Sequence, residues 1–422
     1  MDAVAACPLL ERLGAQPRPE GWKALRAAAE ARLEGADLPT TRQEDWKYLN
    51  LDPLRTFKPA AAPAPEVDIK DAILPEARGT RLVFVNGHYE ASHSCVSGLP
   101  AGVRFMPLRK AEDAAAALGA LSEAHPDLFT TLNTARFEDG ALLFVPRQVK
   151  VEAPLHLLSL TEGEGAVHQP RLLVVLERGA EARLIEDHQG RGAAFVNAVI
   201  EIRLAEGAIL HHERVQRDDA KAIHVSNLFA ELARNAQYHS RTLTFGARLS
   251  RQNPHVILAE GSTATLDGLA LLGGDQVADT HSFTHHAKPH GTSRQLHKLV
   301  VDGEARAVFN GRVRVDKHAQ VTDGQQQVRT LLLSDAARVD AKPQLEIFAD
   351  DVKCSHGAAI GQLDPEELFY LRSRGLSDEL ARNLLTYGFA ADLLAHVPVA
   401  SLRRALRALV LARTHGEALG DL

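Results

Sequence analysis

Cysteine and aromatic residues are scarce in this sequence. The 422 residues include only three cysteines, Cys7, Cys95 and Cys354, and aromatic residues make up 5% of the chain. An odd number of widely separated thiols does not form a disulfide framework and is typical of a reducing compartment. Three thiols are also too few for an iron–sulfur cluster that needs four cysteine ligands, so a partner would have to supply the rest.

The sequence also lacks a strong charge of either sign and any long apolar run. Lys and Arg number 48 against 54 Asp and Glu, for a net charge of −6. The absence of a basic excess argues against nucleic acid as the main partner. No stretch is apolar enough to span a bilayer, and the segment Met1–Pro8 does not have the pattern of a signal peptide. We therefore expect a soluble, cytoplasmic protein that binds neither nucleic acid nor membranes.

Motifs of several enzyme classes are missing. The sequence contains no GxxxxGK[ST] phosphate loop, no G-x-S-x-G nucleophile elbow, no H-E-x-x-H metal motif and no C-x-x-C pair. These absences predict that the chain is not an enzyme on its own.

A weak repeat runs through the middle of the chain, where strand-like runs alternate with turn residues. Gly179, Gly207, Asn235 and Gly261 each open such a run, at spacings of 28, 28 and 26 residues. A period in the twenties is typical of short strands stacked in a solenoid. Gly or Asn also suits a corner with positive φ. We expect a β-helix or a related two-sided β-solenoid, with an ordinary β-sandwich as the alternative.

Helical patterns precede this region. Apolar residues recur at helical spacing from Trp22 to Leu33, and residues 108–132 return to an Ala-rich helical pattern. Between them, Pro59–Pro65 has the composition of a linker, and the strand-like run 81–89 contains an Asn-Gly turn that predicts a hairpin.

Helical patterns also follow it. Asp364 before Pro365 is a helix start signal, and Gly375 suits the end of that helix. A second helix is expected from Ser377 to near Gly388, followed by shorter amphipathic pieces. The predicted organisation is a mainly helical domain with a short hairpin (1–140), a β-helix core (141–360) and a C-terminal helical domain (361–422).

Cys354 and His356 are candidate metal ligands. In a strand, residues i and i+2 point to the same face, so this thiol and this imidazole would present together. Both are ligands for borderline metals such as iron. The alternative is that they only pack at the edge of the core. An open solenoid end exposes strand edges that invite another chain, which favours a shared site.

Histidines also cluster between His281 and His297, in a run that includes His285, His286 and His290. Such a cluster suits a metal, but no fixed ligand spacing recurs within it. A structural or subunit-interface role is the favoured alternative.

Four segments together resemble one known family over nearly the whole chain. They are Glu44–Tyr48, Lys288–Lys298, Phe309–Val313 and Cys354–Gly375. The resemblance is to the SufB/SufD family of SUF-system iron–sulfur cluster assembly proteins. The low cysteine count and the Cys-Ser-His-Gly form at Cys354 resemble its SufD type more than its SufB type.

The resemblance implies a fold and a role. It implies a right-handed parallel β-helix flanked by N-terminal and C-terminal helical domains, acting as a non-catalytic scaffold subunit. It implies pairing with a SufB-like paralogue through the β-helix ends, where a transient iron–sulfur cluster forms at a site shared with His356 and Cys354. It further implies binding of a SufC-like ATPase through Leu368, Phe369, Tyr370, Arg372, Arg374 and Gly375.

Two other functions stay open from the sequence. One is a carbohydrate-active β-helix enzyme, which would need paired carboxylates in a groove. The other is a purely structural subunit in which His356 only packs. The sequence leaves undetermined the cluster type, whether the complex binds flavin and whether the isolated chain forms a homodimer.

Overall fold

The computed structural model describes residues 12–13, 21–60, 67–111, 113–114 and 117–413. Cys7 and most of the expected linker at 59–65 lie outside the described residues. No helix in the described parts of the chain is long and apolar enough to cross a membrane.

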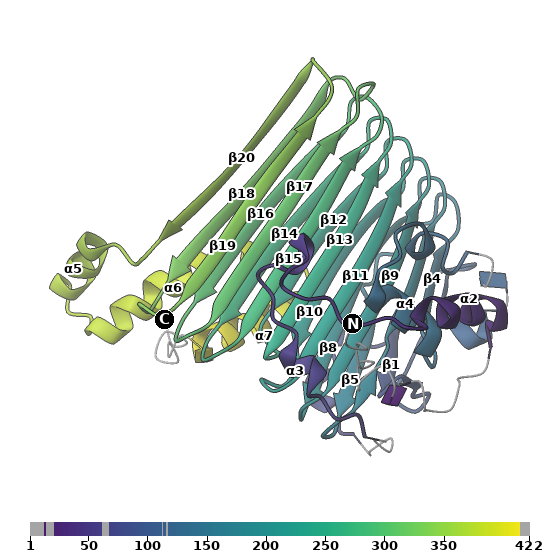
Figure 1. Cartoon of the computed structure of the whole chain (residues 1–422), viewed down its shortest axis with the longest axis horizontal. Coiled ribbons are helices and arrows are strands. Elements are labelled where there is room, and N and C mark those ends of the chain that lie inside the picture. Colours follow the sequence, from purple (N-terminus) through teal and green to yellow (C-terminus); the bar gives the residue numbers. More distant parts are fainter. Residues whose placement is uncertain (1–11, 14–20, 61–66, 112, 115–116, 414–422) are drawn as a thin grey trace, which may run out of the picture.

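Two facing sheets form a β-solenoid of about eight turns (Figure 1). The first sheet has the order β2-β1-β5-β8-β10-β12-β14-β16-β18-β20, and the second runs β19-β17-β15-β13-β11-β9-β7-β4-β3 with β6 beside β9. The strands are β1 (Arg81–Val85), β2 (His88–Tyr89), β3 (Arg104–Pro107), β4 (Ala141–Val145), β5 (Leu155–Glu162), β6 (Val167–His168), β7 (Arg171–Leu176), β8 (Glu181–Arg191), β9 (Phe195–Leu204), β10 (Ile209–Arg217), β11 (Ile223–Leu232), β12 (Gln237–Thr244), β13 (Leu249–Leu258), β14 (Thr263–Leu272), β15 (Val277–His286), β16 (Thr292–Val301), β17 (Arg306–Val315), β18 (Thr322–Leu332), β19 (Arg338–Ile347) and β20 (Val352–Gly361).

The repeat in the sequence marks the corners of the solenoid. Gly179, Gly207, Asn235 and Gly261 all adopt positive φ, between 57° and 68°. From one turn to the next the strands pair parallel and in register, so that Leu210 lies between Ala182 and Tyr238. The predicted mainly β fold with a β-solenoid core is confirmed, and so is the hairpin, in which β1 pairs antiparallel with β2.

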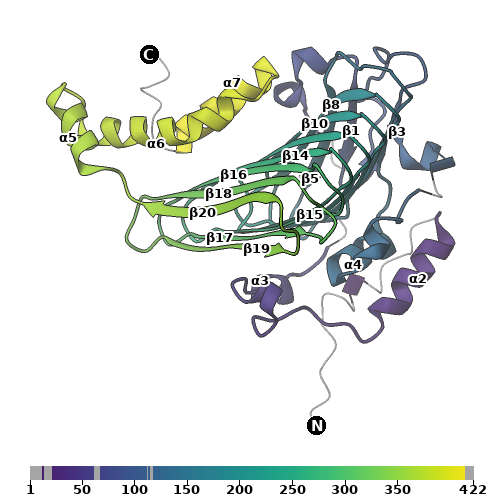
Figure 2. The ribbon, with the colours of Figure 1, turned by 90° about the horizontal axis from the view of Figure 1, so that it is seen from above.

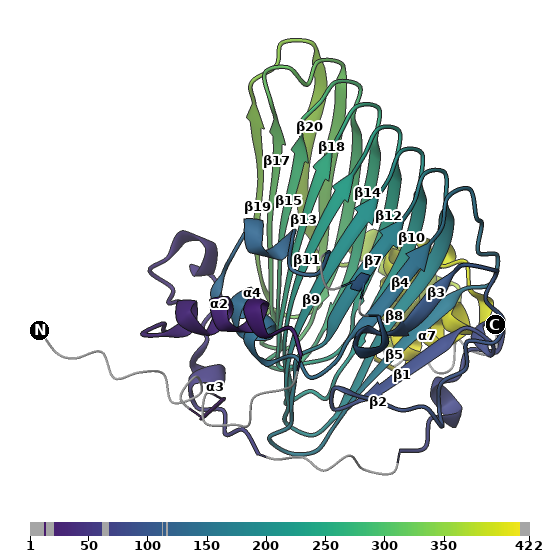
Figure 3. The same ribbon diagram turned by 90° about the vertical axis from the view of Figure 1, so that its right-hand side faces the viewer.

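The helices cover the two outer faces of the solenoid (Figures 2 and 3). On the second sheet, residues of α4 (Leu128–Arg136) pack against Phe195, Ile223 and Leu249. On the first sheet, α6 (Asp378–Ala395) and α7 (Ala400–Arg413) pack against outward side chains of β10, β12, β14 and β16. The other helices are α2 (Lys23–Leu33), α3 (Asp52–Arg55) and α5 (Pro365–Ser373).

Two helical expectations differ from the structure. Among the described residues of 108–132, short 3₁₀ turns precede α4, because the buried carboxylate of Glu201 accepts hydrogen bonds from the backbone N–H groups of Gly119, Leu121 and Ser122. These bonds hold the chain in a turn. Helix α6 also does not end near Gly388. A helical glycine costs about 1 kcal/mol relative to alanine, and the burial of Leu393 and Leu394 beyond it offsets that cost.

A buried ammonium attaches α6 to the first sheet. Lys298 on β16 is 4% exposed, and its Nζ donates to Asp392 Oδ2 at 2.6 Å and to the Phe389 carbonyl at 2.8 Å. The same ammonium lies 4.8 Å from the centre of the Phe389 ring. This contact fixes the C-terminal helices relative to the strands.

We predict that Asp392→Ala lowers the free energy of unfolding by about 1–3 kcal/mol, because it leaves the Lys298 ammonium short of a partner. Urea unfolding measures the change. The matched control is Asp378→Ala on the same helix, since Asp378 makes exposed pairs with Arg382 and Arg372, and such pairs contribute only about 0–1 kcal/mol. Equal losses for the two variants would show that Lys298 does not anchor the helix.

Candidate functional site

Strand β20 is the last strand of the first sheet and carries Cys354 and His356. It pairs with β18 in parallel, with Gly324 opposite Cys354 and Gln326 opposite His356. Gln326 is fully buried inside the solenoid. Because strand alternation is preserved across a ladder, Cys354 and His356 continue the inward-facing positions of β18 to the edge of the sheet. The structure therefore brings the two predicted ligands to one face, at an edge open to another chain.

The two side chains differ in their surroundings. Cys354 is half-buried beside Val313 and Val315, and a Cβ added at Gly324 would lie 3.3 Å from its Sγ. Burial raises the pKa of the Cys354 thiol, so the free thiol keeps its proton at neutral pH. His356 is exposed. Metal binding would have to displace the thiol proton, which a cation can do by lowering the pKa of a coordinating sulfur.

The edge supplies only part of a coordination sphere. Among the described residues, no group of three or more His, Cys, Asp or Glu side chains lies close enough together to hold a metal ion. A tetrahedral site at Cys354 and His356 would need two further ligands. Cys354 and His356 would thus supply two of the four ligands of such a site.

The residues expected to bind an ATPase lie on α5 and just after it, and α5 projects from the sheets (Figure 1). No residue of α5 is buried, and Phe369 and Tyr370 are 73% and 56% exposed. Arg374 lies over the Tyr370 ring at 5.2 Å, and Arg372 pairs with Asp378 of α6 at 3.3 Å. Asp364 caps the helix as expected, accepting from the Glu366 N–H. Leu368 is partly buried and Gly375 has a φ of 95°.

The histidine cluster does not form a single site. Strand alternation on β15 sends His281 and His285 to the outer face, where they lie near Asp279 and Asp316. His286 points inward and bonds to Ser293 Oγ at 2.9 Å. His297 lies on β16 in the opposite sheet and is buried beside Phe309.

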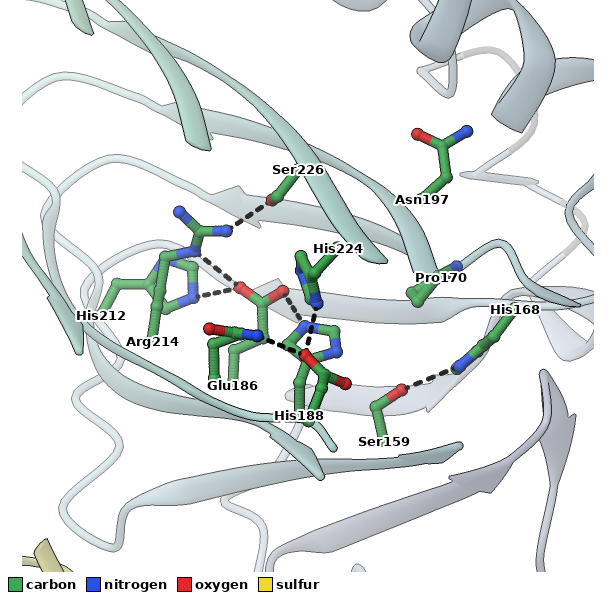
Figure 4. Close-up of polar contacts among 12 residues, drawn as sticks. Ser159, His168, Pro170, Glu186, His188, Asn197, His212, Arg214, His224 and Ser226 are labelled. Atoms are coloured by element: carbon green, nitrogen blue, oxygen red, sulfur yellow. Dashed lines mark hydrogen bonds and ion pairs between the residues drawn. The ribbon is translucent and has the colours of Figure 1, made fainter. Parts of the chain in front are cut away.

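A second polar site fills the interior of the early turns, and the sequence analysis missed it (Figure 4). Glu186 stands at its centre. One carboxylate oxygen lies 2.7 Å from His188 Nε2, and the other lies 3.1 Å from both His212 Nε2 and Arg214 Nε. Arg214 also donates to Ser226 Oγ on the facing sheet at 2.6 Å. The network joins the two sheets across the interior.

Charge and burial act against each other in this network. Burial alone would raise the pKa of Glu186, but Arg214 and the neighbouring histidines hold the pKa well below its usual range. Asp218, which bonds to His224 Nδ1 at 2.9 Å, likewise has a lowered pKa despite its burial. Both carboxylates therefore stay ionised at neutral pH. The signal in the sequence was polar residues at alternate positions of a buried strand, such as Glu186 and His188.

Comparison with known proteins assigns the chain to a family. The family model described as the SufBD core domain of SUF-system FeS cluster assembly matches residues 159–389, and the model of the SufBD N-terminal region matches residues 15–157. The chain belongs to the SufBD family. The match to the family's core domain covers most of the β-solenoid. The chain is therefore a component of iron–sulfur cluster assembly.

Individual relatives are similar over most of their length. An iron–sulfur cluster assembly SufBD family protein of Synechocystis is 38% identical over 410 residues, covering 92% of this chain and 90% of the relative. The iron–sulfur cluster assembly protein SufD of Escherichia coli is 33% identical, covering 97% and 96%. The chloroplastic protein ABCI7 of Arabidopsis thaliana is 31% identical, covering 90% and 83%. The predicted resemblance to the family, including its SufD type, is confirmed.

The interior histidines predict a loss of stability in mild acid. Burial lowers the pKa of both His168 and His297 to about 3, from an ordinary value of 6.5. Between about pH 6.5 and pH 3 the unfolded chain protonates these histidines and the folded chain does not. The free energy of unfolding therefore falls as the pH drops through this range. Buried carboxylates with a lowered pKa, such as Glu186 and Asp218, lose their contribution only below about pH 4. Buried carboxylates with a raised pKa, such as Glu213, oppose the decline, so a decline between pH 7 and pH 5 comes from histidine.

We expect the free energy of unfolding to fall between pH 7 and pH 5, and to fall less in a His297→Gln variant. Urea unfolding at both values measures the difference. His318→Gln is the matched control, because His318 is exposed at a corner. A His297→Gln variant with the pH dependence of the unmodified chain would contradict the assignment.

Proposed function

We propose that this chain is a non-catalytic scaffold subunit that acts in the cytoplasm, pairs with a SufB-like paralogue and recruits a SufC-like ATPase. The nascent iron–sulfur cluster is its cargo. In this proposal the cluster is built where β20 meets the partner, and this chain contributes His356 and Cys354.

The main support is the distribution of exposed apolar side chains. Among the described residues, the large hydrophobic side chains that are exposed all fall between positions 321 and 370: Val321, Ile347, Phe348, Ile360, Phe369 and Tyr370. They lie on the last turns of the solenoid and on α5. Apolar surface gathered in one region marks an interaction site.

The strand edges give this region a means of pairing. β19 and β20 end their sheets, so each carries backbone N–H and C=O groups that can pair with another strand. A paralogue with the same fold presents the same two edges, and end-to-end docking would continue both ladders. Its side chains would then face Cys354 and His356 and could complete the coordination of iron or sulfide.

Helix α5 suits a separate partner. It is the only α-helix among the described residues with no buried side chain, and both Phe369 and Tyr370 are exposed on its surface. Aromatic residues are enriched at protein interfaces. Arg372, through Asp378, connects α5 to α6, which Lys298 fixes to the first sheet. Force applied by an ATPase at α5 would reach the solenoid chiefly through the chain itself, since α5 lies directly between β20 and α6 in the sequence.

We predict that His356→Ala leaves the three-subunit complex assembled but lowers its yield of iron–sulfur cluster several-fold. The imidazole supplies a ligand atom that alanine lacks. Anaerobic analysis of iron and sulfide in the co-purified complex measures the yield. His318→Ala serves as a control, because His318 is also exposed but lies in the corner before β18 and not on the edge strand β20. A normal yield from His356→Ala would eliminate the ligand role and leave a structural one.

For α5 we predict a loss of ATPase binding without a loss of paralogue binding. Replacing Phe369 and Tyr370 together with alanine should abolish co-purification of the ATPase and preserve that of the paralogue, because truncating an aromatic anchor typically costs about 2 kcal/mol or more. Arg382→Ala on α6 is a control at a charged side chain that is 50% exposed. Retention of the ATPase by the double variant would place its binding site elsewhere.

A further inference from the structure

A groove lies on the outer face of the second sheet, away from β20. Its volume is about 310 Å³, and it runs across five strands, from β11 to β19. It joins two features that the proposed function does not use, the Glu44–Tyr48 segment and His281 of the histidine cluster. The segment Glu44–Trp46 forms one wall, and the sheet forms the floor.

Strand alternation builds the floor from two parallel rows of side chains. One row, called the amide row here, contains Asn227, Asn253, His281, Asn310 and Lys342. Within it Asn253 donates to Asn227 Oδ1 at 2.8 Å, and Asn310 Oδ1 accepts from Gln344 of the other row at 3.1 Å. The other row presents planar groups on successive strands, in the order Phe229, His255, Phe283 and Arg312.

The planar groups already contact one another. His255 meets Phe283 edge to face at 4.6 Å, and the Arg312 guanidinium lies over the same phenylalanine at 4.5 Å. His125, on the wall, lies 4.0 Å from His255. The row is therefore a run of aromatic rings in contact, with His125 against Phe229 and His255, and it ends in a positive charge.

The wall is held by specific contacts. Arg251 donates from Nη1 to the Asp45 carbonyl at 2.9 Å and stacks on the Trp46 ring at 4.3 Å. Lys342 pairs with Glu44 at 2.5 Å on the rim. These contacts place Trp46 beside the groove.

Two buried polar atoms, on residues that line the groove, have no hydrogen-bond partner among the described residues. Asn227 is 2% exposed, and its Nδ2 donates to no described atom. His255 Nε2 is likewise without a hydrogen bond. Burial and the nearby His125 lower the pKa of His255 to about 3, so the imidazole is neutral at pH 7. A buried amide donor without a partner is costly, and a ligand acceptor would remove that cost.

At the other end, Arg312 has donors to spare. Its side chain is 49% exposed and makes one long ion pair, with Glu346 at 3.6 Å, which leaves its other N–H groups for a ligand. A guanidinium can bind a carboxylate or a phosphate in a bidentate manner. The groove thus combines an aromatic surface, an unsatisfied amide donor and an available cation.

We propose that this groove binds a planar aromatic anion no larger than a mononucleotide. Its ring lies along the row of Phe229, His255 and Phe283, its ring acceptor meets Asn227, and its anionic group meets Arg312. The volume is at the lower end of the roughly 300–1,000 Å³ found for small-molecule sites.

An extended peptide fits less well. Its side chains on one face repeat every 6.6–6.8 Å or so, whereas the amide row repeats at the strand spacing of about 4.8 Å. The anionic group is a carboxylate or a phosphate, since Arg312 can pair with either.

Trp46 provides a direct test on the isolated full-length chain. The sequence has two tryptophans, so a Trp22→Phe background leaves Trp46 as the only one. We expect its fluorescence to change saturably with adenosine 5′-monophosphate, which identifies a phosphate ligand, or with nicotinate, which identifies a carboxylate. Adenosine has the ring without the anionic group, and inorganic phosphate has the anionic group without the ring. Each should bind at least tenfold more weakly than adenosine 5′-monophosphate.

Arg312→Gln should weaken binding by about tenfold, the usual worth of one charge-assisted hydrogen bond. Arg314→Gln is the matched control, since Arg314 lies on the same face of β17 with a 44% exposed side chain, but outside the groove. Calorimetric titration of the unmodified chain checks that the Trp22→Phe change did not create the signal.

Absence of saturation by both anions up to about 10 mM, a concentration that would detect even millimolar affinity, would overturn the proposal. Equal weakening by Arg312→Gln and Arg314→Gln would overturn it too, because it would indicate general charge attraction. The outcome is independent of cluster assembly, since neither partner nor iron is present.

Discussion

The parallel, in-register ladder between successive turns is the constraint on which the rest of this structure depends. Each strand pairs with the strands one turn before and one turn after it, so a side chain's position along the strand fixes its neighbours in both directions. The ladder also has to stop. At β20 it stops with Cys354 and His356 still in inward-facing register and no following strand to cover them. The candidate metal site is thus a consequence of where the solenoid ends.

The same ladder explains how a solenoid can hold a charged interior. Glu186 and Arg214 occupy adjacent positions of one column, on β8 and β10, and are 3.1 Å apart. An isolated buried charge would cost far more than a folded protein can tolerate. Because Glu186 also contacts His188 and His212, its charge is shared among three partners. Register places the partners, and burial then strengthens their interaction.

Some of this could be predicted from the sequence and some could not. The corners at Gly179, Gly207 and Asn235 could be predicted, because a positive φ favours glycine or asparagine at that position. The shared face of Cys354 and His356 was also predictable, since an i, i+2 pair lies on one face of any strand. The contacts of Glu186 were not, because its partners lie on the next turn and across the interior, and their identity depends on register. For Gly388, the local signal was outweighed by tertiary packing of α6 on the first sheet.

The N-terminal and C-terminal helices cover different outer faces of the solenoid, and neither set covers its last turn. The N-terminal helices cover the outer face of the second sheet and the C-terminal helices cover that of the first, so the middle turns have little apolar surface left to offer. The last turn is different, because α5 leads the chain away from β20 instead of back across it (Figure 2). Had α5 folded onto the sheet, it would have covered the edge and buried Phe369 and Tyr370. Its projection leaves the strand edges accessible, leaves Phe369 and Tyr370 exposed, and places these two surfaces apart from each other. A partner at the edges and a partner on α5 could therefore bind together without competing, as a scaffold subunit requires.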